Sequence, residues 1–405
     1  MNIQKVTFLN RENQKLKGRL ELPLNQKPHN FAIFAHCFTC NKNLSAVKNI
    51  SRELTANGFG VLRFDFTGLG ESDGDFENTN FSGNVDDLIY AANFLTKNFI
   101  APTVIIGHSL GGSAAIFAAS KINSIKAVAT IGAPSNPKHV QNLLRSNIDE
   151  IKANGKALVD LGGRAFTIKK QFLDDLEKQS LPQIAKNLNK ALLIIHSPQD
   201  TTVEIKNAEE IYVAAKHPKS FVSIDGADHL LQKKEDSKYV GNLIANWTKR
   251  YINMPNTDTL KTAHQVIASL NAKDGFSTQM KVGSHYMMAD EPTSFGGNNF
   301  GPSPYEYVSA GLSACTAMTI QMYAKRKNWN VENVEVHTSY EKTHAEDCND
   351  CDNANSKIDV FNREIKLSGD LDDKQLKRLL QIADKCPVHK TLHARVKIVS
   401  KIITA

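Results

Sequence analysis

The stretch Val104-Ile-Ile-Gly-His-Ser-Leu-Gly-Gly112 decides the fold of the first part of the chain. An apolar run of strand length leads into a Gly-x-Ser-x-Gly sequence, and a helical segment of small residues follows. A sharp turn from strand to helix strains its central residue, and flanking glycines relieve the clashes there. We therefore expect Ser109 to present its hydroxyl at a sheet edge, beside a helix N-terminus. A small-residue turn that only packs a helix on a sheet is the alternative.

Short apolar runs alternate with helical segments on both sides of this motif. The pattern predicts strands over 31–35, 60–64, 103–106, 127–131, 191–195 and 220–224, and helices over 44–57, 84–97, 113–121 and 207–216. Such alternation is typical of a doubly wound α/β fold, in which helices cover both faces of a parallel sheet. We also expect an antiparallel hairpin over 5–9 and 15–22, and a helical, cap-like insertion over 137–185.

A catalytic serine needs a base and an acid that orients the base. In this fold class they are expected later in the chain, first the acid and then the histidine, each just after a strand. Asp200 follows one such strand and His229 follows the next, so Ser109, Asp200 and His229 are the predicted triad. The competing residues are His196 as the base and Asp225 and Asp228 as the acid.

Acyl transfer also needs hydrogen-bond donors for a developing oxyanion. We expect the backbone N–H groups of Leu110, directly after the serine, and of Phe38, in the loop after the strand at 31–35, to supply them. The same loop holds Cys37 and Cys40 as a Cys-x-x-Cys pair, which is open to a redox interpretation. We favour a role in shaping the oxyanion loop, with both cysteines as free thiols.

These residues resemble the α/β-hydrolase family over about residues 1–250, and we place the domain at 1–252. The segment Arg63-Phe-Asp-Phe-Thr-Gly-Leu-Gly-Glu-Ser72 is similar to the family's Asp-x-x-Gly-x-Gly-x-Ser loop. The resemblance implies hydrolysis of a small-molecule ester or amide through an acyl-Ser109 intermediate, without a cofactor. It does not imply a substrate, because the family also holds C–C hydrolases, dehalogenases, acyltransferases and inactive members.

The pattern changes after an amphipathic stretch at 230–251. Residues 253–260 read as a turn-rich linker. Beyond it, alternating patterns predict strands over 263–270, 277–288, 331–338 and 357–367, with helices over 305–326 and 372–385. The segment 261–405 is therefore expected to form a second, α+β domain with a largely antiparallel sheet.

Two cysteines of this domain draw attention. Cys315 lies among small residues in the long predicted helix, and Cys386 precedes Pro387, where a helix is expected to stop. From the residues alone, a buried small hydrophobic side chain is the ordinary interpretation of each.

The segments Gly301-Pro-Ser-Pro-Tyr-Glu-Tyr-Val-Ser-Ala-Gly-Leu-Ser-Ala-Cys315 and Cys386-Pro-Val-His389 resemble the OsmC/Ohr family, over about residues 262–405. The resemblance implies an intertwined homodimer that reduces organic hydroperoxides. Cys315 would be the peroxidatic thiol and Cys386 the resolving thiol, with an external dithiol as reductant.

The resemblance also implies a cation that lowers the pKa of the reactive thiol. In the family, an Arg of the first hairpin is held by a Glu shortly after the loop proline, and Glu306 is this chain's acid there. The candidate cations are Lys281 and His285 in the first hairpin, and Arg326 and Arg395 elsewhere.

The acidic segment Thr343-His-Ala-Glu-Asp-Cys-Asn-Asp-Cys-Asp352 allows three interpretations. His344, Cys348 and Cys351 fit a metal cluster, with His337 or Asp352 as a fourth ligand. Cys348 and Cys351 also fit a regulatory dithiol. A plain loop between two strands is the favoured interpretation, and no metal is assigned.

Composition narrows the function classes. The formal net charge of +7 comes from 49 Lys and Arg against 42 Asp and Glu, with no concentrated basic run, so we expect no nucleic-acid partner. The longest uncharged stretch, 98–120, contains proline and glycine turns, and we expect no membrane segment. Six cysteines and no apolar leader favour a cytoplasmic protein.

The alternative to two enzymes in one chain is that one domain is only a binding or dimerisation module.

Overall fold

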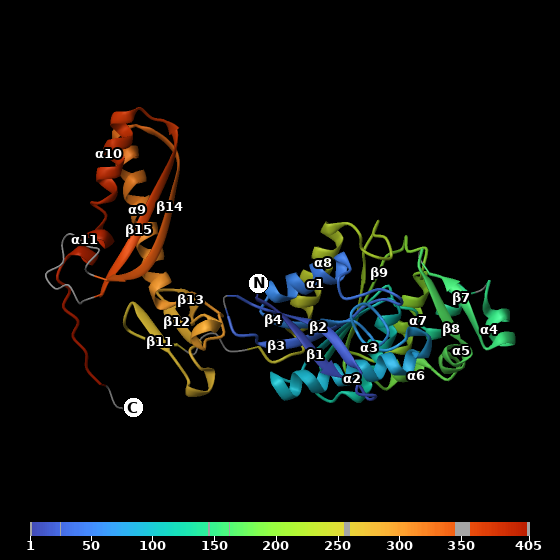
Figure 1. Ribbon diagram of the computed structural model, residues 1–405. Coiled ribbons are helices and arrows are strands. Elements are labelled where there is room, and N and C mark those ends of the chain that lie inside the picture. Colours follow the sequence, from blue (N-terminus) through green and yellow to red (C-terminus); the bar gives the residue numbers. More distant parts are fainter. Residues whose placement is uncertain are drawn as a thin grey trace. The chain divides into compact units, whose positions relative to one another are not determined.

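A mixed eight-stranded sheet organises the first part of the chain (Figure 1). Its strand order is β1-β2-β4-β3-β5-β6-β9-β10. The strands are β1 (Asn2–Leu9), β2 (Lys15–Leu22), β3 (Asn30–Ala35), β4 (Phe59–Phe64), β5 (Val104–His108), β6 (Ala127–Ile131), β9 (Ala191–His196) and β10 (Lys219–Ser223). The hairpin of β1 and β2 joins β4 in antiparallel fashion, and all other pairings are parallel.

The computed structural model in Figure 1 divides into two units, Met1–Ala263 and His264–Ala405. The described residues are 2–24, 26–144, 146–161, 163–254, 260–344 and 357–402. Residues 255–259 of the predicted linker lie outside these ranges, so the domain boundary at 252 and 261 stays a prediction. Within the described residues, no helix is both long and apolar enough to cross a bilayer.

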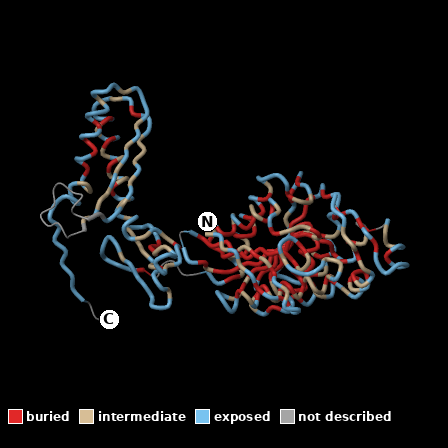
Figure 2. Tube along the Cα trace, viewed as in Figure 1, coloured by how far each residue is buried: buried red, intermediate tan, exposed pale blue. Residues whose placement is uncertain are grey.

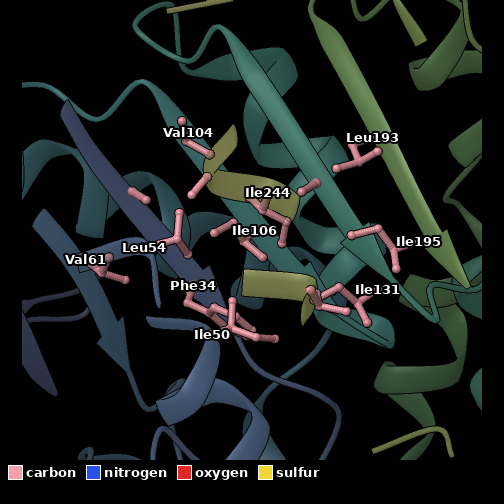
Figure 3. Close-up of a cluster of buried hydrophobic side chains, with 14 of the residues drawn as sticks. Phe34, Ile50, Leu54, Val61, Val104, Ile106, Ile131, Leu193, Ile195 and Ile244 are labelled. Carbon is pink, nitrogen blue, oxygen red and sulfur yellow. The ribbon is translucent and has the colours of Figure 1, made fainter. Parts of the chain in front are cut away.

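Helices cover both faces of the sheet, as the apolar strands require (Figure 1). The helices α1 (Ser45–Ala56) and α8 (Lys234–Thr248) pack together on one face, and α2 (Phe81–Asn98) and α3 (Leu110–Lys121) pack together on the other. α7 (Lys206–Ala214) connects β9 to β10. Figure 3 shows the core between α1, α8 and the central strands, where Phe34, Ile106 and Leu193 are fully buried.

The insertion over 137–185 is not purely helical, so that prediction is wrong. It contains helical segments at Pro137–Leu144, α4 (Ile148–Asn154), α5 (Lys170–Glu177) and α6 (Leu181–Lys186), but also a hairpin of β7 (Lys156–Asp160) and β8 (Ala165–Lys169). Ala157 and Val159 are buried while their neighbours in β7 are exposed, which is the period-two pattern of a half-covered strand. Gly155 ends α4 in a left-handed conformation, with φ +78°.

The second unit has an α+β arrangement, as expected. β11 (Val266–Ser269), β12 (Thr278–Val282) and β13 (His285–Ala289) form an antiparallel sheet, and β14 (Asn330–His344) and β15 (Lys357–Asp370) form a two-stranded ribbon. The helices are α9 (Pro304–Lys327), α10 (Asp373–Ala383) and α11 (Pro387–His393).

One sequence prediction fails in this unit. The strand expected over 277–288 is a hairpin, because Gly283 adopts φ +59° and turns the chain between β12 and β13. The helix expected to stop before Pro387 does so, since α10 ends at Ala383 and Cys386 has an extended backbone. Pro387 then stands at the first position of a new helix, α11, where proline lacks only an N–H that has no helical partner.

Candidate active sites

Ser109 occupies a sharp turn between β5 and α3. Its φ is +55° and its ψ is −128°, a strained conformation for a residue with a side chain. A Cβ on Gly107 would lie 2.2 Å from the carbonyl oxygen of Gly111, and one on Gly111 would lie 2.3 Å from that of His36. Both glycines are therefore required by close backbone approach, and the turn exposes the Ser109 hydroxyl at the carboxyl edge of the sheet.

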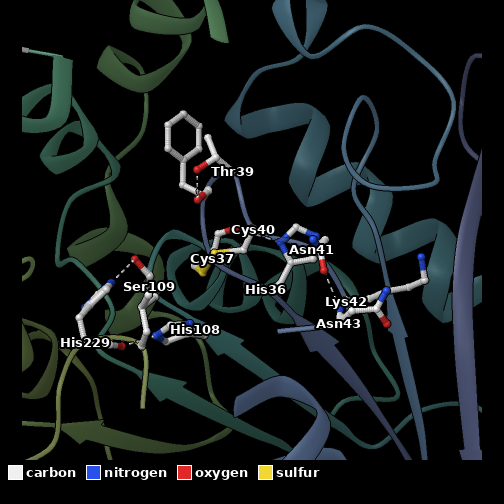
Figure 4. Close-up of a disulfide and its surroundings, with 12 residues drawn as sticks. His36, Cys37, Thr39, Cys40, Asn41, Lys42, Asn43, His108, Ser109 and His229 are labelled. Carbon is white, nitrogen blue, oxygen red and sulfur yellow. Dashed lines mark hydrogen bonds between the residues drawn. A yellow bond between two sulfur atoms is a disulfide. The ribbon is translucent and has the colours of Figure 1, made fainter. Parts of the chain in front are cut away.

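His229 and Asp200 lie beside this hydroxyl. His229 Nε2 is 3.0 Å from Ser109 Oγ, and His229 Nδ1 is 2.6 Å from Asp200 Oδ2 (Figure 4 shows the serine contact). Asp200 follows β9 and His229 follows β10, so the parallel order of the strands brings the three residues together. The serine, imidazole and carboxylate form one continuous hydrogen-bonded chain.

Asp200 is held as a carboxylate. Burial alone acts to raise its pKa, but the hydrogen bond and charge of His229 oppose this effect. The N–H groups of Thr202 and Val203 donate to Oδ1 at 2.8 and 2.9 Å, and the net effect lowers the pKa of Asp200. An ionised Asp200 fixes the proton of His229 on Nδ1 and leaves Nε2 free to accept the serine proton.

The competing residues have other contacts. His196 Nε2 hydrogen-bonds the carbonyl of Val203 at 2.7 Å and lies 3.6 Å from Asp200 Oδ2, so it packs behind the acid. Asp225 accepts a hydrogen bond from Ser223 within its own turn. Asp228 accepts from the N–H of Leu230 at 2.8 Å and shapes the turn that carries His229.

The residue before the serine also supports the site, a role that the sequence did not suggest. His108 is buried, and its Nε2 donates to the carbonyl of His229 at 2.6 Å. Burial, followed by the charge of the neighbouring His229, lowers the pKa of His108 to about 3. His108 is therefore a neutral ring at neutral pH, and it fixes the backbone that carries the base.

The loop after β3 borders the serine (Figure 4). Leu110 is the first residue of α3, and Phe38 lies in the loop, so both predicted donor residues border the turn. Cys37 and Cys40 are joined in a disulfide, so the expectation that both are free thiols is wrong. Two cysteines separated by two residues can be free thiols or form a disulfide. Here the tertiary structure sets the backbone turn that brings the two sulfurs together.

A cavity of about 760 Å³ opens at Ser109 and His229. Its other lining residues come from the oxyanion loop, from the inserted hairpin and from the loops after β9 and β10; among them are Phe38, Leu44, Leu161, Arg164, Thr202 and Leu230. The insertion thus contributes to the walls of the site. The volume and the mixed apolar and polar lining suit a small organic molecule.

Arg164 is a further cavity residue that sequence reasoning did not find. It lies in the turn between β7 and β8, its guanidinium hydrogen-bonds the carbonyl of Thr39, and it stacks over the ring of Phe166. It therefore links the inserted hairpin to the oxyanion loop. No local motif marks it, because the two segments are far apart in sequence.

The loop that resembles Asp-x-x-Gly-x-Gly-x-Ser braces this region. Asp65 is buried and pairs with the equally buried Lys42, which also binds Glu71 at 2.6 Å. A Cβ on Gly70 would lie 2.2 Å from Asp65 Oδ2. The motif holds the segment after the oxyanion loop and does not itself line the cavity.

The two cysteines of the second unit lie together. Cys386 is fully buried, and its sulfur accepts hydrogen bonds from the His389 N–H at 3.3 Å and from Thr316 Oγ1 at 3.8 Å. Burial acts to raise the pKa of Cys386, but the His389 N–H and the Cys315 thiol hydrogen-bond its sulfur. With Thr316 and the Val388 N–H added, the net effect lowers the pKa of Cys386.

Arg363 is linked to Cys386 through the hydroxyl of Thr316, and it was not among the predicted candidates. Its guanidinium donates to Thr316 Oγ1 at 2.7 Å and pairs with Asp384 at 2.7 Å. It comes from β15, and nothing in the alternating sequence of that strand indicates that this arginine lies near the thiols. Only the antiparallel pairing and the packing of α9 against the ribbon bring it to the thiols.

The predicted cations and their acid lie elsewhere. In the described part of the chain, the hydrogen bonds and ion pairs of the two thiols include none from Lys281, His285, Arg326 or Arg395. Lys281 stacks over Tyr286, and Arg326 over Tyr323. Glu306 accepts a hydrogen bond from the N–H of Ser303 at 2.6 Å as part of a capping box at the start of α9.

The candidate metal segment falls mostly outside the described residues, which exclude Cys348, Cys351 and Asp352. His344 belongs to β14, and His337 Nε2 lies 3.7 Å from Glu335 Oε2. Among the residues that the structure describes, no group of three or more His, Cys, Asp or Glu side chains has the arrangement to hold a metal ion. The three interpretations of this segment stay predictions.

Comparison with known proteins agrees with the division of the chain into two units. Residues 27–157 match the serine aminopeptidase S33 family, and residues 296–401 match OsmC-like proteins. The esterase domain of a Rhodothermus marinus protein is 47% identical, with a TM-score of 0.52, and the match covers 62% of this chain and 99% of that domain. No curated protein matched the chain.

More distant structures share the fold. Est1E from Butyrivibrio proteoclasticus, solved with ferulic acid bound, is 21% identical over 61% of this chain and 99% of its own, with a TM-score of 0.50. The α/β hydrolase GrgF from Penicillium sp. sh18 is 16% identical over 62% of this chain and 99% of its own, with a TM-score of 0.52.

The fold and site of the first unit are those of a serine hydrolase. The chain belongs to the α/β-hydrolase family, in a form that carries an OsmC-like domain fused to its C-terminal side.

Proposed function

We propose that the first domain is a carboxylesterase-like hydrolase that forms an acyl-Ser109 intermediate on a small-molecule ester or amide. The observation that carries this proposal is the chain of contacts of 3.0 and 2.6 Å from Ser109 through His229 to Asp200, at the mouth of the cavity. The 47% identity to an esterase domain supports ester over amide chemistry.

In this mechanism, Ser109 Oγ attacks the carbonyl carbon while His229 Nε2 takes its proton. The protonated imidazole then gives this proton to the leaving alcohol, and the ester bond breaks. Water attacks the acyl-Ser109 in the same way, with His229 as base, and releases the acid. Asp200 stabilises the imidazolium and keeps the ring in position.

The developing negative charge needs donors on the far side of the carbonyl. The N–H groups of Leu110 and Phe38 are proposed for this role, because Leu110 begins α3 and Phe38 lines the cavity beside the serine. The N-terminus of α3 adds a favourable dipole.

A fluorophosphonate probe and hydrolysis of p-nitrophenyl acetate test this proposal on the full chain. We expect one probe adduct, on Ser109, and loss of both labelling and turnover in Ser109→Ala. Ser120→Ala is the matched control, since Ser120 lies on the exposed end of α3 and donates to the carbonyl of Phe117 in the same helix. Folded wild-type protein without an adduct would contradict the hydrolase proposal.

We propose, for the second domain, reduction of organic hydroperoxides by Cys315 and Cys386. The Cys315 thiolate attacks the O–O bond, which gives an alcohol and a sulfenic acid on Cys315. Cys386 then displaces water to form a disulfide. An external dithiol reduces this disulfide and is itself oxidised.

The contact between the two thiols supports this pairing, and Arg363 is the cation that we assign to it in place of the predicted ones. The hydrogen-bond donors converge on Cys386, so Cys386 also competes for the role of first attacking thiol.

Turnover of cumene hydroperoxide with dithiothreitol as reductant tests the peroxidase proposal. Loss of turnover in Cys315→Ser, with slower recycling in Cys386→Ser, is expected, and unchanged turnover in Cys315→Ser would overturn the proposal.

The alternative is that the OsmC-like domain only binds a ligand or forms the dimer. Large apolar side chains on α9 and α10 are exposed, including Met318, Met322 and Leu380, which supports a homodimer through this domain. Sedimentation of the full chain tests the dimer. Absence of peroxide turnover together with an intact dimer favours the binding module. A cytoplasmic location stays a prediction.

A further inference from the structure

The loop after β3 carries a disulfide that the proposed mechanism does not use. Cys37 and Cys40 are bonded, their Cα atoms lie 5.3 Å apart, and both residues line the cavity at Ser109. We propose that this disulfide holds the oxyanion loop in its active conformation, and that a dithiol which reduces it lowers esterase turnover. This inference rests on the proposed hydrolase function and adds redox control to the same site.

The disulfide closes the turn that contains the proposed donor. Phe38 lies between the two cysteines, and the N–H of Cys40 donates to the carbonyl of Cys37 at 3.1 Å. Thr39 adopts φ +61°, a left-handed conformation that a β-branched residue disfavours. His36 Nδ1 also donates to the Cys37 carbonyl, at 2.9 Å. A turn with this conformation needs restraints, and the disulfide is the covalent one.

We expect this bond to fix the position of the loop rather than to change the overall stability of the fold. A cross-link stabilises a fold by restricting the unfolded chain, and the restriction is smallest for a short loop. Cys37 and Cys40 are separated by only 3 positions. Non-covalent restraints on the loop also include the Arg164 contact to the Thr39 carbonyl and the packing of Phe38 on Phe172, with ring centroids 5.4 Å apart.

The bond is accessible to a reductant from the cavity. Cys37 is buried, whereas Cys40 is partly exposed and lines the cavity, so we assign Cys40 as the residue that is attacked. A thiolate of the dithiol bonds to Cys40 Sγ, the Cys37–Cys40 bond breaks, and Cys37 leaves as a thiolate. The second thiol then attacks the mixed disulfide and releases Cys40. The protein gains two thiols, and the dithiol becomes a cyclic disulfide.

Turnover of p-nitrophenyl acetate by the air-oxidised and dithiothreitol-treated full chain tests the inference. Loss of one oxyanion donor lowers kcat by about 100-fold or more, so a loosened loop is expected to lower kcat by about tenfold. KM should stay within about twofold, because an oxyanion donor acts mainly on the transition state. Reoxidation with diamide should restore the rate.

Two double variants assign the effect. Cys37→Ser/Cys40→Ser should have the reduced-state kcat with and without dithiothreitol, and Cys315→Ser/Cys386→Ser should respond as the wild type does. Equal kcat in oxidised and reduced wild type overturns the inference and leaves the esterase proposal standing. Complete alkylation of Cys37 and Cys40 before reduction also overturns it. Absence of turnover and of Ser109 labelling in both redox states means that the hydrolase proposal has failed.

Discussion

The two units of this chain hold their reactive groups in different ways. In the first unit, β5 and β9, which precede Ser109 and Asp200, are buried on both faces, and Figure 2 shows a nearly continuous buried centre. In the second unit, the β14–β15 ribbon is mostly exposed or half-buried, and the fully buried cluster is small. An isolated two-stranded ribbon is marginally stable. The first site is therefore complete within one chain, while the second unit leaves apolar surface that a second subunit can cover.

The largest effect that separates the two sites is expected from Asp200→Asn. The amide cannot hold the Nδ1 proton of His229 as the carboxylate does, so kcat of ester hydrolysis should fall by about 10³–10⁴-fold. Asp225→Asn is the matched control, because Asp225 accepts a hydrogen bond from Ser223 within its own turn. Peroxide turnover by Cys315 should be unchanged. A small loss of esterase activity in Asp200→Asn would contradict the assigned acid.

Core truncation tests the difference in packing. Leu193 and Leu379 are both fully buried, but Leu193 belongs to the large core of the first unit and Leu379 to the small cluster of the second. Leu-to-Ala changes cost about 2–5 kcal/mol, and we expect Leu193→Ala near the upper value and Leu379→Ala near the lower one. Urea unfolding can follow each unit separately, through Trp247 in the first and Trp329 in the second. Equal losses would contradict the comparison.

Removal of the buried histidine behind the base should have a smaller effect. His108→Ala removes the donor 2.6 Å from the carbonyl of His229, and kcat should fall by about tenfold, since one net hydrogen bond contributes about 1 kcal/mol and its loss loosens the base. The loss should be constant across neutral pH, because the lowered pKa of His108 keeps the ring uncharged there. His108→Gln should recover part of the rate. A loss that varies with pH would assign His108 a titrating role.

The smallest effect is expected at the thiols. Thr316→Val removes one of the hydrogen bonds that lower the pKa of Cys386, so the thiolate forms at higher pH. The ultraviolet absorbance of the thiolate should then rise at higher pH than it does in the wild type. Ser313→Ala is the control, since Ser313 bonds Thr338 and not a thiol. An unchanged pH profile would show that Thr316 has no influence on the thiol.

Sequence reasoning located the residues that are marked by a short, contiguous stretch of sequence. The strand, the glycines and the serine of the nucleophile turn are contiguous, and the strands before Asp200 and His229 are marked by apolar runs. The order of serine, acid and histidine that is expected for this fold class was enough to predict that the three residues meet. The same reasoning missed the hairpin at 156–169, because each of its strands has only five residues, and it missed the turn at Gly283.

What the sequence by itself determined is the class of each domain and the residues that we propose as nucleophiles, because periodicity and short motifs depend on neighbours along the chain. What only the tertiary structure decided is which distant groups surround those nucleophiles: the Cys37–Cys40 bond at the oxyanion loop, Arg164 from the insertion, and Arg363 beside the thiols. Hydrogen bonds, ion pairs and disulfides act over a few ångströms in space, and nothing in the local pattern of Arg164 or Arg363 specifies which remote loop it will contact.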